Sequence, residues 1–429
     1  MSRSKQVIKQ IGLSAILKGI NFFLSLWLVP LTIQFLGQNV YGTWVTAITI
    51  VSWVGLMDIG FGHGFRNHLT EAVSLRDWEK ANTIISTAYK AIGTLSTIAL
   101  LIGLPVVCAL NWQSILNNYK IKEWEYQIGM SILFITVINN FFWGLINQLF
   151  NAIQENAFTS LGQITLNTIL IISLFITPEQ IQNKILVYAL IYLTGTLFSY
   201  GCLYLFFFKR NKQFKISNTS YNKIYAKKMF SVGGDFFIIQ VAAIIIFSTT
   251  NILISHISGP DAVAQYNVVL RLFSSIGFII SLVIAPLWSA FTDAKVKNDF
   301  FWIRKQIFKL NIMMIPVTVL IIGCAFFSDF ILKKWISPSF SAPSLLIWTT
   351  AMFSLISIWN NIYAYYLNGI TRTKEQKITS IWAMAINIPL SFFLGSTIGM
   401  GTAGIVLSSI ICLLPFATIA PFVTYKTIK

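Results

Sequence analysis

Long apolar segments recur along nearly the whole chain and are separated by short polar ones. Residues 98–110 and 241–247 carry no charge and lie inside apolar stretches of about twenty residues, long enough to cross the hydrocarbon core of a bilayer. Because a backbone in lipid must satisfy its own hydrogen bonds, these stretches are predicted to be helices. We expect an all-α integral membrane protein with about twelve spans, at 11–35, 40–60, 82–110, 127–152, 156–176, 185–208, 229–255, 262–290, 306–326, 343–369, 377–398 and 401–424.

Positive charges are distributed unevenly between the two ends of these spans. With the N-terminus inside, 23 of the 31 Lys and Arg residues fall on the inner side, 5 on the outer side and 3 within spans. Cytoplasmic loops carry the excess of Lys and Arg in membrane proteins, so both termini are predicted to be cytoplasmic. The basic residues 1–10 lead into the first span without a small-residue cleavage motif, and we expect that this helix is retained.

Composition narrows the class of protein further. Only 10% of residues are charged and 55% are hydrophobic, which leaves too little polar surface for a soluble fold. The basic residues are not gathered on a soluble module, so no nucleic-acid partner is expected. The cysteines lie singly in apolar spans without CxxC spacing, and we expect neither a metal nor a cofactor; they are Cys108, Cys202, Cys324 and Cys412.

Short motifs repeat between the two halves of the chain. Phe35-Leu36-Gly37 is followed 222 residues later by Ile257-Ser258-Gly259, and residues 150–153 resemble residues 367–370 at an offset of 217. The basic segment 209–228 falls between the halves. We therefore predict an N-terminal six-helix bundle at 1–208, a cytoplasmic connector at 209–228 and a C-terminal six-helix bundle at 229–429, an arrangement found in transporters.

Lys18 is predicted to lie within the first span, on a polar face of the helix. It belongs to the stripe Ser14, Lys18, Asn21 and Ser25, whose spacing of i, i+4, i+7 and i+11 follows one helix face. Ionisable residues within a span are costly unless they face a cavity or a partner. Lys18 and Asn21 are therefore candidates for substrate binding, and the alternative for Lys18 is that it snorkels to the head groups.

Arg271 is predicted to lie well inside the eighth span without an acid at i±3 or i±4. A guanidinium keeps its charge and presents a planar fork that suits phosphate oxygens, so an anionic ligand would explain this position. The alternative is an interhelical pair with Asp58 or Asp235. Both acids lie towards the cytoplasmic ends of their spans, and we assign Asp58, Asp235 and Arg66 to gating or ion coupling.

Amide and aromatic side chains follow one face of each of two spans at corresponding places in the halves. Asn140 and Asn147 lie on the fourth span, and Trp359 and Tyr363 on the tenth. Such groups suit sugar rings, to which they offer CH contacts and hydrogen bonds. Interhelical hydrogen bonding uses the same residue types, so both interpretations stay open.

Several stretches match a known family along nearly the whole chain. They are Leu28-Val29-Pro30-Leu31, Phe35-Leu36-Gly37-Gln38-Asn39-Val40-Tyr41-Gly42-Thr43-Trp44, Asp58-Ile59-Gly60-Phe61-Gly62 with Arg66, and Tyr266 with Arg271-Leu272. The pattern resembles the Wzx-type O-antigen flippases, the polysaccharide branch of the multidrug/oligosaccharidyl-lipid/polysaccharide exporter superfamily. Where that family carries an acid after Leu-Gly-x, this chain has Asn39.

The resemblance implies an inner-membrane flippase with two six-helix bundles in a V. Its cargo would be an undecaprenyl-diphosphate-linked oligosaccharide repeat unit, an O-antigen or capsule precursor, moved to the outer leaflet by alternating access with H⁺ or Na⁺ coupling. A polymerase and a chain-length protein would be its partners. Lys18 and Arg271, at different depths, would neutralise the diphosphate in steps.

Two other functions are weighed against flipping. A multidrug exporter of the same superfamily would need an acidic cavity for its cationic substrates, whereas the spans contain three cations against two acids. A membrane-embedded polysaccharide polymerase would bring a long outer loop, and the longest here covers only residues 111–126. We therefore expect a transporter rather than an enzyme.

Overall fold

The computed structural model describes residues 3–53, 61–178, 180–217, 221–230, 248–284, 287–370 and 372–428. These residues form helices and connecting turns and contain no strand. The chain divides into two compact units, which are considered separately below. Unit 1 comprises Met1–Gly37 and Ala47–Gly234, and unit 2 comprises Gln38–Thr46 and Asp235–Lys429.

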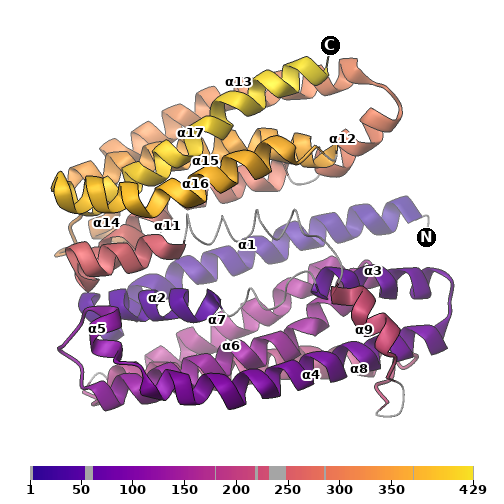
Figure 1. Cartoon of the computed structure of the whole chain (residues 1–429), viewed down its shortest axis with the longest axis horizontal. Coiled ribbons are helices and arrows are strands. Elements are labelled where there is room, and N and C mark those ends of the chain that lie inside the picture. The colour runs from indigo at the N-terminus through magenta and orange to yellow at the C-terminus, as the bar shows by residue number, and fades with distance from the viewer. Residues whose placement is uncertain are drawn as a thin grey trace. The chain divides into compact units, whose positions relative to one another are not determined.

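Unit 1 is built on long helices that lie side by side around α6 (Figure 1). Its elements are α1 (Arg3–Leu36), the end of α2 (Gln38–Ser52), α3 (Phe61–Ser74), α4 (Trp78–Ala109), α5 (Trp112–Leu116), α6 (Glu123–Ala152), η2 (Asn156–Phe158), α7 (Thr159–Ile176), α8 (Lys184–Arg210) and α9 (Lys223–Phe230). Helix α6 packs against α3, α4 and α8, and α1 packs against α7.

Unit 2 has the corresponding arrangement around α15. Its elements are the start of α2, the helical residues 248–258, α11 (Pro260–Ile284), α12 (Leu287–Val296), α13 (Phe300–Phe326), α14 (Ser328–Trp335), α15 (Ser344–Gly369), α16 (Lys374–Phe392), the π-helix η3 (Phe393–Thr397) and α17 (Gly401–Thr427). Helix α15 packs against α12, α13 and α17, as α6 packs against α3, α4 and α8 in unit 1.

Ten helices within the described residues are long and apolar enough to cross a membrane. They match ten of the expected spans, and the prediction of an all-α membrane protein is confirmed. The two remaining spans, expected at 40–60 and 229–255, run into residues outside the described ranges. The count of twelve and the cytoplasmic placement of the termini therefore stay predictions, as do the domain boundaries at 208 and 228.

The two units share the same turns at a constant offset. Gly37 and Gly259 both have positive φ, at 80° and 85°, and the amide of each donates to the carbonyl four residues earlier. The turns that precede α4 and α13 correspond as well, because Asp77 and Asp299 each cap the following helix with a side-chain oxygen. These pairs lie 222 residues apart, as the sequence motifs indicate.

The C-terminal ends of α6 and α15 match at the second offset, 217. The amide of Glu155 donates to the carbonyl of Phe150, and the amide of Arg372 donates in the same way to Leu367, both at 2.8 Å. At each of these helix ends, a threonine of the neighbouring short helix donates a hydrogen bond to a backbone carbonyl. Thr70 donates to the Ala152 carbonyl at 3.4 Å, and Thr292 donates to the Gly369 carbonyl at 2.7 Å. One backbone scaffold thus occurs twice in the chain.

Large apolar side chains project outward from the long helices. Phe23, Leu101 and Phe326 are each exposed to more than 70%, although polar side chains usually occupy the surface of a soluble protein. The interior of each unit is packed in the ordinary way. Phe61, Phe65 and Phe150, for example, are fully buried in one cluster of unit 1. This combination fits helices that use lipid as their outer solvent.

The basic connector packs along α4 in unit 1. Asn82 binds it in both directions, since its amide donates to the Gln213 carbonyl at 3.2 Å and its oxygen accepts from the Lys215 amide at 2.8 Å. Five residues further along α4, the side chain of Thr87 accepts from the Asn222 amide at 3.0 Å. Side-chain contacts of α4 therefore hold the connector in place.

The start of α2 crosses the start of α11 within unit 2. Asn39 donates to the Asp261 carboxylate at 2.9 Å, so the turn that lacks an acid in the sequence pairs with an acid from another helix. One helical turn later, a Cβ built on Gly42 would lie only 1.8 Å from the carbonyl oxygen of Pro260. Only glycine permits this crossing, as small residues do where membrane helices approach closely.

We expect Gly42→Ala to lower the thermal midpoint of the purified protein, because overpacking of a tight contact costs about 1–3 kcal/mol. Gly323→Ala is the matched control, since a Cβ on Gly323 of α13 would meet nothing within 4 Å. Midpoints should be measured in detergent by intrinsic fluorescence. Equal midpoints for the two variants would contradict the close crossing of α2 and α11.

Candidate functional site

Lys18 lies on α1 with an exposed side chain, and it forms no ion pair with any described carboxylate. Two other members of its polar stripe form hydrogen bonds within unit 1. The Asn21 oxygen accepts a hydrogen bond from Asn167 of α7 at 2.9 Å, and Ser25 donates to the carbonyl of Phe22 at 2.7 Å. Asn21 therefore helps to hold α1 against α7, and the charge of Lys18 remains available to a ligand.

Arg271 lies on α11 of unit 2 and is half-buried. Its Nε is buried and has no hydrogen-bond partner among the described residues. The guanidinium is close enough to the buried hydroxyl of Tyr41 to interact with it electrostatically. A buried donor on a permanent charge is costly to leave unpaired, so this geometry leaves Arg271 able to bind an anion.

The neighbours of Arg271 are occupied by local hydrogen bonds. Asn267 donates to the Asn251 oxygen at 2.9 Å and to the Val263 carbonyl at 2.8 Å. Ser275 donates to the Arg271 carbonyl at 2.7 Å. Among these polar residues of α11, only the guanidinium of Arg271 therefore retains an unused buried donor in the described part of the chain.

Asn140 and Asn147 lie two turns apart on α6 of unit 1, and both are half-buried. The side-chain oxygen of each is buried without a hydrogen-bond partner in the part of the chain that the structure describes. Asn147 lies within hydrogen-bonding range of Tyr200 on α8. These two amides thus keep unused acceptors inside the unit, which suits the hydroxyl groups of a sugar.

Trp359 and Tyr363 on α15 have their polar atoms engaged in helix packing. The indole N–H of Trp359 donates to the Ala417 carbonyl of α17 at 2.9 Å. Tyr363 is fully buried, and its hydroxyl donates to Asn311 of α13 at 3.0 Å. Interhelical hydrogen bonding, one of the two interpretations open from sequence, describes both residues here.

The three residues assigned to gating or ion coupling are only partly described. Arg66 lies on α3 and is half-buried, and its carbonyl accepts from Thr70 at 2.8 Å. Asp58 and Asp235 lie outside the described residues. Their roles, and that of Arg66, stay predictions.

A cluster of buried polar side chains between α16 and α17 was not predicted from the sequence. Asn387, 1% exposed, donates to Ser409 at 3.3 Å, and Ser391 shares a hydrogen bond with Ser408. The spacing of Asn387 and Ser391, four residues apart on an apolar helix, is the signal that would have found it. Among the described residues no group of three or more His, Cys, Asp or Glu side chains could hold a metal ion.

Residues 7–291 match the sequence profile of the family described as polysaccharide biosynthesis protein. The chain belongs to this polysaccharide biosynthesis family. A candidate O-antigen export protein of Yersinia pseudotuberculosis is 21% identical over 411 residues, which cover 92% of this chain and 88% of that protein. A candidate O-antigen transporter of Salmonella typhi is 19% identical over 355 residues, covering 81% and 79% of the two chains.

The fold also matches that of solved transporter structures. An inward-facing multidrug resistance MATE family transporter of the MOP superfamily superposes with a TM-score of 0.79, covering 97% of this chain and 98% of that one at 13% identity. Together with the ten candidate spans, the family and fold show a multi-pass protein of the bacterial inner membrane. The fold is the one that the MATE family membrane transporter has.

Proposed function

We propose that this member of the polysaccharide biosynthesis family is a Wzx-type flippase. It moves lipid-diphosphate-linked oligosaccharide repeat units, the precursors of O-antigen or capsule, from the cytoplasmic to the outer leaflet. Family membership and the O-antigen relatives support the class of cargo. The observation that carries the chemistry is the buried Nε of Arg271, which has no hydrogen-bond partner among the described residues and lies in a candidate membrane span.

The proposed binding groups are charged side chains for the diphosphate and amides for the sugar. Arg271 offers a planar fork to phosphate oxygens, and Lys18 adds an exposed point charge in the other unit. Asn140 and Asn147 contribute unused acceptors for hydroxyl groups. Alternating access would bring the cargo to these groups in turn, with H⁺ or Na⁺ coupling through Asp58, Asp235 and Arg66.

Two further parts of the proposal concern orientation and partners. Both termini face the cytoplasm, and a reporter fused after Lys215 should therefore be cytoplasmic and one fused after Glu123 exterior. A polymerase and a chain-length protein that use the flipped repeat unit would be functional partners in lipopolysaccharide or capsule synthesis.

The test of this function is a deletion strain that carries the gene on a plasmid. We expect loss of the protein to remove surface polysaccharide and to leave lipid-linked repeat units in the cytoplasmic leaflet, where an added periplasmic glycosidase cannot reach them. The multidrug alternative makes the opposite forecast. Unchanged polysaccharide together with increased sensitivity to cationic dyes would replace the flippase by a drug exporter.

A further inference from the structure

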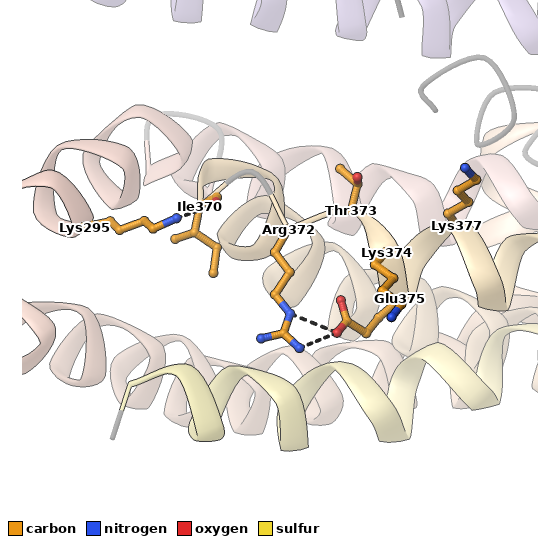
Figure 2. A pocket seen from close by; sticks show the side chains of 7 residues that line it. All are labelled: Lys295, Ile370, Arg372, Thr373, Lys374, Glu375 and Lys377. Atoms are coloured by element: carbon orange, nitrogen blue, oxygen red, sulfur yellow. Dashed lines mark hydrogen bonds and ion pairs between the residues drawn. The ribbon is translucent and has the colours of Figure 1, made fainter. Parts of the chain in front are cut away.

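A basic pocket of about 540 Å³ lies in unit 2, where α15 ends and α16 begins (Figure 2). Four cationic side chains and one acid contribute to its lining: Lys295, Arg372, Lys374, Lys377 and Glu375. One candidate span ends at Gly369 and the next begins at Lys374. The pocket therefore lies at the depth of lipid head groups.

Contacts inside the pocket fix two of the cations. Lys295 reaches across from α12 and donates to the Ile370 carbonyl at 2.7 Å, whereas Arg372 turns towards Glu375 (Figure 2). The Nε of Arg372 and a second N–H bind the same Glu375 oxygen, with Nε at 2.9 Å. This hydrogen bonding raises the pKa of Arg372, whose guanidinium is charged in any case.

The single acid of the pocket is thus neutralised by one of the four cations. Neither Lys295 nor Lys374 forms an ion pair with a described carboxylate, and both are exposed. The pocket therefore carries a net positive charge, together with two lysines that can direct N–H donors at a ligand. Lysine binds phosphate as a point charge.

Unit 1 has the same backbone scaffold without these charges. The same helix end and the same threonine contact occur there, formed by Thr70 and Ala152 in place of Thr292 and Gly369. At the offsets of 222 and 217, the counterparts are Val73 for Lys295, Glu155 for Arg372, Ala157 for Lys374 and Ser160 for Lys377. Glu155 pairs with Arg210 at 2.8 Å, which leaves that position neutral. The fold therefore does not require the basic pocket.

The basic pocket is also not explained by a general excess of positive charge on the inner side of the membrane. Exposed Arg304, Lys305 and Lys309 on the first turns of α13 already supply such charge to unit 2. The pocket differs from these because its cations surround one hollow and come from separate elements, α12 and the start of α16. Basic pockets between membrane helices bind the head groups of anionic lipids.

We propose that this pocket binds the phosphate of a lipid head group. The phosphate has two sources, an anionic phospholipid of the bilayer or the diphosphate of the lipid-linked cargo. Only the second source rests on the proposed function.

The experiment measures lipid binding to the purified full chain in detergent by microscale thermophoresis. Short-chain phosphatidylglycerol, phosphatidylcholine and a short polyprenyl diphosphate are the probes. We expect the wild type to prefer one or both anionic probes to phosphatidylcholine. The double variant Lys295→Gln/Lys374→Gln should bind the preferred probe about tenfold more weakly, because each lysine near a membrane surface contributes measurably to anionic lipid binding.

Arg304→Gln/Lys305→Gln is the matched control, since it removes two exposed charges from the same unit outside the pocket. Lys295→Arg/Lys374→Arg keeps the charge and should keep the binding. If the glutamine double variant loses its cooperative thermal transition, Lys374→Gln alone replaces it, because this side chain is exposed and forms no ion pair with a described carboxylate.

The outcomes separate the two sources. Weaker binding of phosphatidylglycerol alone identifies a phospholipid site, and weaker binding of the polyprenyl diphosphate, alone or with phosphatidylglycerol, identifies a site that accepts the cargo head group. Equal affinities of the pocket variant and the wild type for both anionic probes would overturn the proposal, as would equal affinity of the wild type for phosphatidylcholine. Because no transport step is measured, neither result depends on whether the protein flips its cargo.

Discussion

Replacing Arg271 with alanine should nearly abolish surface polysaccharide while the protein still reaches the membrane at normal levels. The half-buried guanidinium has no ion pair with a described acid, and its Nε has no hydrogen-bond partner among the described residues. If it binds the diphosphate, the alanine variant loses a charge-assisted contact of about 2–5 kcal/mol, which is more than a tenfold loss of affinity. Lipid-linked precursor should then accumulate in the cytoplasmic leaflet.

The geometry of the fork can be tested separately from its charge. Arg271→Lys retains the charge but loses bidentate hydrogen bonding, so we expect partial export. Arg304→Ala is the control, since it removes an exposed arginine from the start of α13. Export should be measured as surface polysaccharide at matched membrane levels of each protein.

A structural ion pair would give a different pattern. If Arg271 only neutralises Asp58 or Asp235, then Arg271→Gln combined with Asp58→Asn or with Asp235→Asn should recover export, because both charges of the pair are removed together. Recovery in either double variant would rule out the diphosphate role. Persistent failure in both would support it.

Replacing Lys18 with alanine should reduce export severalfold without lowering the amount of protein. Lys18 is exposed on α1, whereas its neighbour Asn21 is already hydrogen-bonded to Asn167, so the charged amine is open to a ligand. Lys18→Arg should retain most of the export, because the positive charge is kept. The rate of precursor flipping after induction is the measurement.

Lys90→Ala provides the matched control for Lys18. Lys90 is also exposed and lies within a span, but its amine sits over the Tyr221 ring at 5.5 Å from the centroid. We expect normal export from this variant. Full activity of both Lys18→Ala and Lys18→Leu would show instead that Lys18 snorkels to the head groups.

The apolar pattern predicted most of the fold because a bilayer imposes a simple rule. A stretch such as 343–369 must form a helix if its backbone is to be satisfied in lipid, and α15 covers Ser344–Gly369. The short helices were not predicted. Helix α3, Phe61–Ser74, lies in a segment assigned only as a polar connection, where no continuous apolar run marks its limits.

The site residues divide according to whether their polar atoms have partners. Sequence alone identifies Tyr363 as an amphipathic residue on an apolar helix, and both sugar binding and helix packing are compatible with that. The structure shows its hydroxyl bound to Asn311 of another helix, a partner 52 residues away. For Arg271 the sequence excludes only a partner on the same helix, whereas the structure shows that no described acid from any helix pairs with it.

The sequence by itself determined the class of protein, the helical spans and the repeated turns, because these depend on local composition and spacing. Gly37 and Gly259 mark equivalent turns through their own backbone freedom, with positive φ at both positions. Tertiary structure decided which polar side chains remain available, because hydrogen bonds such as Asn167 to Asn21 join helices that are distant in the chain. It also brought Lys295 to Arg372 and Lys374, since a pocket between separate helices depends on how those helices pack and leaves no pattern along the sequence.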